Sequence, residues 1–492
     1  MANEDPTIID PVTIKILIVA DGRLRFDDHD FGLSLMMEGL HEKSWPIARF
    51  SITTGCRKAK EPDKIHQSNG EGADFPDIQF LDNNLRQTYD EIWIFGDHYE
   101  QLDENGKPRS LTTQLADSEA GLLRGFMQDG GGCFATGDHE SLGAPVNAHL
   151  PRVRSMRVWH NGPPASGTGQ NDTRLANSGS SEQDITPQKI RSRLYKATNS
   201  SVYPHPLLNG PTGAISVLPD HMHEGECREN QTAAELLEYS PQGDLKPLVI
   251  ADSDSSMPPA HAFGAIGAYD GHLVGFGRIV VDASFHHFVN INLRGFSPRS
   301  RTYSGGSIDT GVYAYQNIRS YHQNIAVWLA PPEKQRDMYI RALWEVRWRS
   351  RVYGLLAPGT GTIKPGDLGL GWKEILNLGK QAREALEKLS TPALSFLWSI
   401  ETFGKLTAND PPLSSLYPWL PTKIVPDASA SSSIGIDGEY VIEYMIGGVM
   451  IAMARKFPKK ISVTANPADQ MNEILREGVD LGLKAYRSSL TG

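Results

Sequence analysis

The chain has 492 residues, of which 39% are hydrophobic and 22% charged, and it carries a formal net charge of −10. This length predicts two or three domains, and the composition is that of a globular protein. The acidic balance excludes the basic surface by which proteins hold nucleic acid, so we expect no nucleic-acid partner.

The first half of the chain alternates between strand patterns and helix patterns. Continuous apolar runs predict buried strands at residues 14–20, 48–54, 91–97 and 133–136. Apolar residues at helical spacing lie before the second and the fourth of these runs. The alternation predicts an α/β fold of flavodoxin-like type, with a mainly parallel sheet and helices on both faces.

The middle of the chain is less regular. Residues 161–188 are rich in Gly, Ser, Asn, Thr and Asp, and a loop of that length is a lid, a binding loop or a disordered segment. Two further strands are predicted at residues 248–251 and 273–282.

Helix patterns replace the alternation after about residue 320. Residues 403–437 are rich in Pro, Ser and Asp and predict a long connector. The pair Asn466-Pro467 predicts the start of a final helix. We therefore divide the chain into an α/β domain, 1–330, and a helical C-terminal region, 331–492, and leave open whether the latter mediates self-association.

Three features of the sequence indicate where in the cell the protein is found. The acidic N-terminal residues have no apolar core, which argues against a signal peptide. The most apolar late run, residues 444–454, is shorter than the roughly 20 residues of a membrane span. Three cysteines are too few for a disulfide framework. We expect a cytoplasmic protein without a membrane partner.

Residues 130–143, GGGCFATGDHESLG, form the most informative stretch of the chain. Three glycines and a short apolar strand lead directly to Gly137, Asp138 and His139. Open α/β sheets bind their ligands at the carboxyl ends of buried parallel strands, where such polar residues would lie. Asp138 and His139 are therefore predicted to be catalytic residues.

Other predicted strand ends also carry histidine. His286 and His287 follow the strand at 273–282, and because a strand alternates its side chains, only one of the two can face a given side. A lone histidine at such a place is usually a hydrogen-bonded structural residue. Several strand ends with His or Asp-His weaken that interpretation, and a shared ligand site is an equal alternative.

A separate cluster surrounds His221 and His223. The H-x-H spacing puts two imidazoles on one face of an extended segment, and nearby carboxylates complete a donor set that suits a transition metal. If this segment folds back over the sheet, both histidines meet His139 and could hold zinc, manganese or iron with an activated water. The alternative is a loop whose His and Glu side chains face solvent.

The first domain resembles the class I glutamine amidotransferase-like superfamily, and more specifically its ThuA-like branch. The resemblance covers about residues 13–295 and is carried by three places. These are the polar loop at Asp21, the segment YDEIWIFG at 89–96, and the glycines at 130–132, with the later strand GRIVV at 277–281 ending near His286. The resemblance implies that His286 occupies the place of the superfamily's catalytic histidine.

The chain departs from the superfamily at the nucleophile. The elbow position of the catalytic cysteine is occupied by Gly137, and Cys133 lies four residues earlier, inside the strand. A cysteine beside apolar strand residues is usually a small buried hydrophobe. ThuA-like proteins also lack the nucleophile, so the resemblance implies chemistry without a thiol.

Together these features predict a hydrolase-type enzyme that acts on a small polar substrate. Asp138, His139 and His286 would perform acid–base catalysis, and His221, His223 and His139 would hold a metal. Two alternatives remain: a ligand-binding protein without chemistry, and an assembly component whose C-terminal helices make the contacts.

Overall fold

The computed structural model describes most of the chain in sixteen segments. These are residues 10–21, 24–41, 47–57, 72–80, 84–96, 115–137, 149–158, 188–197, 202–219, 224–229, 231–255, 261–296, 308–356, 370–407, 438–457 and 467–491.

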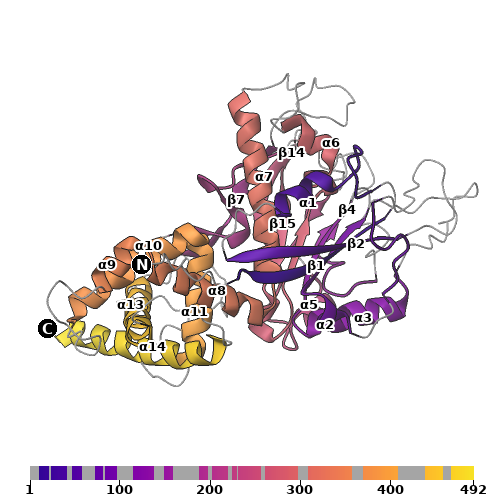
Figure 1. Cartoon of the computed structure of the whole chain (residues 1–492). Coiled ribbons are helices and arrows are strands. Elements are labelled where there is room, and N and C mark those ends of the chain that lie inside the picture. Colours follow the sequence, from indigo (N-terminus) through magenta and orange to yellow (C-terminus); the bar gives the residue numbers. More distant parts are fainter. Residues whose placement is uncertain are drawn as a thin grey trace, which may run out of the picture.

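An eight-stranded, mostly parallel sheet forms the centre of a mixed α/β fold (Figure 1), in the order β2-β1-β3-β4-β16-β15-β14-β7. The first five strands are parallel: β2 (Ala48–Arg57), β1 (Val12–Asp21), β3 (Glu91–Gly96), β4 (Gly132–Gly137) and β16 (Ile279–Asp282). The last three run antiparallel to their neighbours: β15 (His261–Tyr269), β14 (Leu248–Ser255) and β7 (Arg191–Ser192).

The parallel strands are the apolar runs of the sequence. Every residue of β3 and β4 is buried, as expected for strands covered on both faces. The prediction that the strands ending near Ala20, Phe95, Thr136 and Asp282 share one parallel sheet is confirmed.

Two predictions about the last strands were incomplete. The strand predicted at 273–282 begins only at Ile279, because a 3₁₀ turn (Gly271–Val274) and Gly275, with φ +80°, precede it. Strand β15 was not predicted at all, because its sequence HAFGAIGAY is rich in small residues. At Gly264 a side chain is excluded, since a Cβ would lie 2.2 Å from the carbonyl oxygen of Cys227.

Helices from both halves of the chain cover the sheet. Helix α7 (Ile308–Leu329) contacts β1, β4 and β16, and α1 (Ser34–His41) and α6 (Asn290–Phe296) pack beside it. Figure 1 shows these three helices above the sheet and α2 (Leu85–Thr88), α3 (Asp117–Gln128) and α5 (Ala233–Tyr239) below it.

From Ile308 onward every described element is a helix. After α7 come α8 (Pro332–Arg347), α9 (Ser350–Leu356), α10 (Trp372–Leu389), α11 (Pro392–Thr407), α13 (Gly438–Lys456) and α14 (Pro467–Thr491). The final helix begins at Pro467 as predicted. The predicted connector starts later than expected, since α11 continues to Thr407, and residues 408–437 lie outside the described segments.

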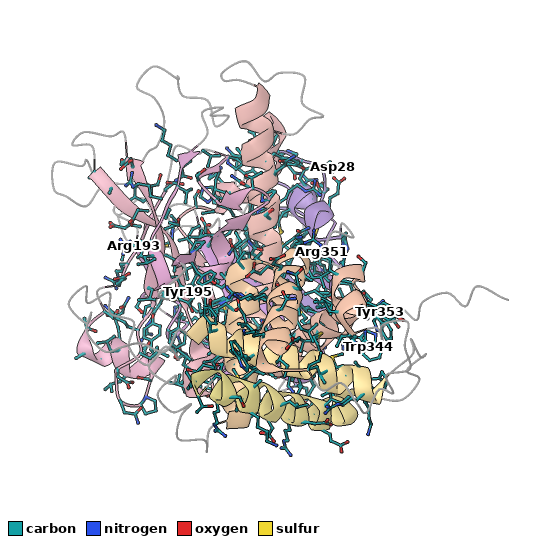
Figure 2. All side chains as sticks on the ribbon, turned by 90° about the vertical axis from the view of Figure 1, so that its left-hand side faces the viewer. Asp28, Arg193, Tyr195, Trp344, Arg351 and Tyr353 are labelled. Carbon is teal, nitrogen blue, oxygen red and sulfur yellow. The ribbon has the colours of Figure 1, made fainter. Side chains whose placement is uncertain are left out.

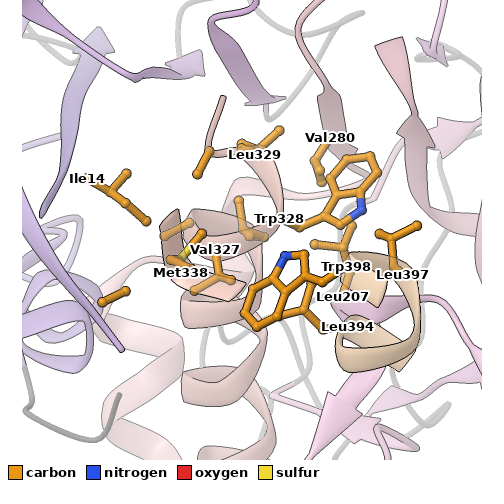
Figure 3. Packing of buried hydrophobic residues seen from close by; sticks show 14 of the residues in the cluster. Ile14, Leu207, Val280, Val327, Trp328, Leu329, Met338, Leu394, Leu397 and Trp398 are labelled. Atoms are coloured by element: carbon orange, nitrogen blue, oxygen red, sulfur yellow. The ribbon is translucent and has the colours of Figure 1, made fainter. Parts of the chain in front are cut away.

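The C-terminal helices pack against the α/β part through a buried ion pair and an aromatic core. Arg278, just before β16, donates to Asp270 Oδ1 at 2.8 Å and to Glu401 Oε1 of α11 at 2.6 Å. Trp328 of α7 and Trp398 of α11 lie among the apolar residues between these elements (Figure 3). The boundary near residue 330 therefore joins two parts that share one core, and whether they are separate domains stays a prediction.

No helix in the described segments combines the length and the apolar character needed to cross a bilayer.

Candidate functional site

The carboxyl ends of β4 and β16 are held side by side by buried polar contacts. Thr136 Oγ1 donates to the carbonyl of Asp282 at 3.2 Å. The fully buried Arg157 donates from Nε to the carbonyl of Ala283 at 2.9 Å and from Nη2 to that of Gly137 at 3.0 Å. Asp138 and His139 follow Gly137 and lie outside the described residues.

Asp282, the last residue of β16, is the hub of a buried network. Its Oδ1 accepts the backbone N–H of Ser284 at 2.9 Å and lies 2.8 Å from His287 Nδ1, while Oδ2 accepts the hydroxyl of Tyr321 at 2.8 Å. Ser284 begins a 3₁₀ turn (Phe285–His287) and accepts the N–H of His286 at 3.2 Å. This turn carries His287 back over the strand end.

The other ring nitrogen of His287 faces a second carboxylate. Nε2 lies 2.6 Å from Gln188 Oε1 and 3.3 Å from Glu224 Oε1, and Gln188 Nε2 donates to Glu224 Oε2 at 2.9 Å. Glu224 is fully buried. Gly225 N donates to the carbonyl of Ala283 at 2.9 Å, which fixes this segment against the sheet.

The electrostatics make His287 a cation between two carboxyl groups. Burial alone would lower its pKa, but the charge of Asp282 and the contacts with Asp282 and Glu224 raise that pKa to about 10. Burial raises the pKa of the Glu224 carboxyl above its ordinary value, although the contact with His287 opposes the shift. Burial and the Asp282 charge together hold the Tyr321 hydroxyl protonated by raising its pKa well above the usual range. The site thus places a protonated His287 next to Glu224, a carboxyl group whose pKa is raised by burial.

His286 points away from this network. Its Nδ1 lies 2.9 Å from Asn292 Oδ1, and its ring packs edge-on to Phe31. The two adjacent histidines thus face different sides, as predicted, although they lie in a turn and not in a strand. The sequence resemblance indicates His286, whereas the structure brings His287 to the carboxylates.

The polar loop after β1 also reaches this edge of the sheet. Asn290 Nδ2 donates to the carbonyls of Asp27 at 3.0 Å and His29 at 2.8 Å, and its Oδ1 accepts the N–H of Leu35 at 3.0 Å. Asp28 is exposed on this loop, near the top of the view in Figure 2 and away from the C-terminal helices.

A thiol nucleophile is absent from the described part of this site. All three cysteines are buried. Cys133 lies inside β4, where burial raises its pKa to about 12, so the thiol is protonated at neutral pH. Cys133 is therefore a buried strand residue, as the sequence predicts.

The predicted metal ligands His221, His223 and His139 all lie outside the described residues. Within the described segments, no group of three or more His, Cys, Asp or Glu side chains is arranged to hold a metal. Glu224, which follows His223, does lie against the sheet edge, so the chain returns there as the fold-back hypothesis requires. The metal site itself stays a prediction.

Sequence reasoning missed the partners of His287. Asp282 ends a predicted strand and Glu224 adjoins the H-x-H motif, so a local signal existed for both. Gln188, and Tyr321 as the partner of Asp282, carry no such signal, because they come from segments far away in the chain.

Comparisons with family models, with curated proteins and with solved structures gave no match, so the functional assignment depends on the geometry of the site.

Proposed function

We propose that the protein is a hydrolase-type enzyme that acts on a small polar substrate, with Asp282, His287 and Glu224 as its acid–base centre. The observation that carries this proposal is the position of His287, whose two ring nitrogens lie 2.8 Å from Asp282 and 3.3 Å from Glu224 at the carboxyl edge of the sheet. A carboxylate on one ring nitrogen fixes the orientation of the imidazole and stabilises its charged form, which is how histidine is prepared for proton transfer.

The roles follow from the charges. His287, held protonated by Asp282, donates a proton to the leaving group. Glu224, whose pKa is raised by burial and whose Oε1 lies 3.3 Å from His287 Nε2, accepts a proton from the attacking water. Asp138 and His139, which follow the neighbouring strand, would complete the substrate site.

The proposal also includes a bound metal ion, to which we assign no step of the reaction. His221, His223 and His139 would hold zinc, manganese or iron, which supplies a water of lowered pKa when it is bound. The His, Cys, Asp and Glu side chains of the described segments do not form a metal site by themselves.

We also infer an amidotransferase-like, ThuA-like origin for the α/β part. The parallel strands follow the order β2-β1-β3-β4-β16, which is the 2-1-3-4-5 order of flavodoxin-like sheets, and this supports the inference. Gly137 at the elbow and the buried Cys133 support chemistry without a thiol.

The test is hydrolysis of a panel of chromogenic esters, amides, phosphate esters and glycosides by the wild type and three single variants. His287→Gln and Glu224→Gln should each lower kcat by at least about 100-fold, the usual loss for a general acid or base. His286→Gln is the matched neighbour and should retain activity within a few-fold. Loss of activity in His286→Gln alone would favour the residue that the family resemblance indicates.

One observation favours a second candidate function. His287, Glu224 and Asp282 are all completely buried, as in an ion network that only stabilises a fold. The protein would then bind a ligand or assemble with partners without chemistry. No turnover across the panel, together with a His287→Gln variant that only loses stability, would support this candidate.

A further inference from the structure

A cavity of about 370 Å³ lies between α8, α11 and α14. It is separate from the candidate site, because the first turn of α8 adjoins the amino end of β1, where Lys334 Nζ donates to the carbonyl of Thr13 at 2.9 Å. The candidate site lies at the opposite, carboxyl edge of the same sheet. The cavity volume is within the range of small-molecule sites.

The charged groups that line the cavity leave an excess of positive charge. Arg336 of α8 and Arg476 of α14 both line it, and neither forms an ion pair with a residue that the structure describes. Glu401 is the single acid among the lining residues. Its carboxylate is already held by the buried Arg278, whose Nη2 lies 2.6 Å from Glu401 Oε1. Arg278 is shared with Asp270, so the guanidinium groups of Arg278, Arg336 and Arg476 and the two carboxylates together leave one net positive charge at the cavity.

Part of the cavity wall is apolar and fixed in place. Trp398 is almost fully buried, and its indole N–H donates to Gln335 Oε1 at 2.5 Å. Gln335 in turn donates to the carbonyls of Trp328 and Ala330, each at 3.1 Å. Leu475 of α14 adds a second apolar surface. Such a wall needs no rearrangement to receive an apolar group, which lowers the entropic cost of binding.

We propose that this cavity binds a small organic anion. Its carboxylate or phosphate group would lie between Arg336 and Arg476, and its apolar part would pack against Trp398 and Leu475. A guanidinium donates two parallel N–H bonds to either type of oxyanion, so the two groups share one recognition chemistry.

The experiment is titration calorimetry on the full-length chain with four probes: phenyl phosphate, benzoate, inorganic phosphate and benzyl alcohol. We expect phenyl phosphate or benzoate to bind more tightly than inorganic phosphate, and the neutral benzyl alcohol not to bind. The tighter of the two aromatic anions identifies the preferred oxyanion. Arg336→Gln and Arg476→Gln should each weaken binding about tenfold, the typical loss of one charge-assisted hydrogen bond.

Arg351→Gln is the matched control, because the side chain of Arg351 on α9 is 75% exposed and Arg351 is not among the residues that line the cavity. It should bind the probes as the wild type does, and circular dichroism should show that all three variants are folded. The proposal is overturned if neither aromatic anion binds at millimolar concentration. Equal weakening in Arg476→Gln and Arg351→Gln would also overturn it, as would equal affinity for phenyl phosphate and inorganic phosphate.

Discussion

The charge of His287 predicts a specific dependence of stability on pH. Its pKa rises from 6.5 to about 10 on folding. A group whose pKa is raised in the folded state stabilises the protein fully below its unfolded pKa, and this contribution is lost as the pH rises through the folded pKa. The stabilisation that the charge of His287 provides is therefore lost as the pH rises from 6.5 to about 10.

The magnitude follows from the width of that pH range. A difference of about 3.5 pH units at about 1.36 kcal/mol per unit gives at most about 5 kcal/mol. Between pH 7 and 8.5 the free energy of unfolding should fall by about 2 kcal/mol through His287 alone. His322 does not contribute there, because burial lowers its pKa to about 3 and the ring is neutral throughout this range.

The assay is urea denaturation at half-unit steps from pH 6.5 to 9, followed by circular dichroism, for the wild type and two variants. His287→Gln should be much less stable than the wild type at pH 6.5, and the gap should narrow as the pH rises. His286→Gln, which leaves the contact with Asp282 intact, should follow the wild-type curve. Parallel loss of stability in the wild type and His287→Gln over this range would refute the reasoning.

Three further predictions concern the core. Arg278→Met should lower the free energy of unfolding by about 3–5 kcal/mol, because it removes the guanidinium that pairs with the buried carboxylate of Asp270, whereas Arg193→Met at a 43%-exposed surface pair should cost under about 1 kcal/mol in the same denaturation assay. Gly277→Ala should be strongly destabilising, since its Cβ would lie 1.8 Å from a backbone oxygen, while Gly121→Ala, with open space in an exposed helix position, should raise the melting temperature. Native protein at pH 8 should leave Cys133 unlabelled by iodoacetamide, as shown by mass spectrometry, and rapid stoichiometric labelling would contradict its burial.

The positions of the parallel strands along the chain were largely readable from local sequence. A strand covered on both faces must be apolar along its whole length, and the runs that became β1, β3 and β4 show this property without reference to any other segment. Strand β15 is rich in small residues instead, and Gly264 fits the close approach of the Cys227 backbone, which is a tertiary constraint.

The candidate site could be predicted from the sequence only in part. The sequence by itself indicated the edge of the sheet where polar groups gather, since polar residues that follow an apolar strand lie at its end. It did not determine which of the two neighbouring histidines meets a carboxylate. That choice is made by the turn after Ser284 and by Gln188, 99 residues away from His287 in the chain. Periodicity reports which face of a segment is buried, whereas the partner across that face depends on how distant segments pack, and only the tertiary structure decides it.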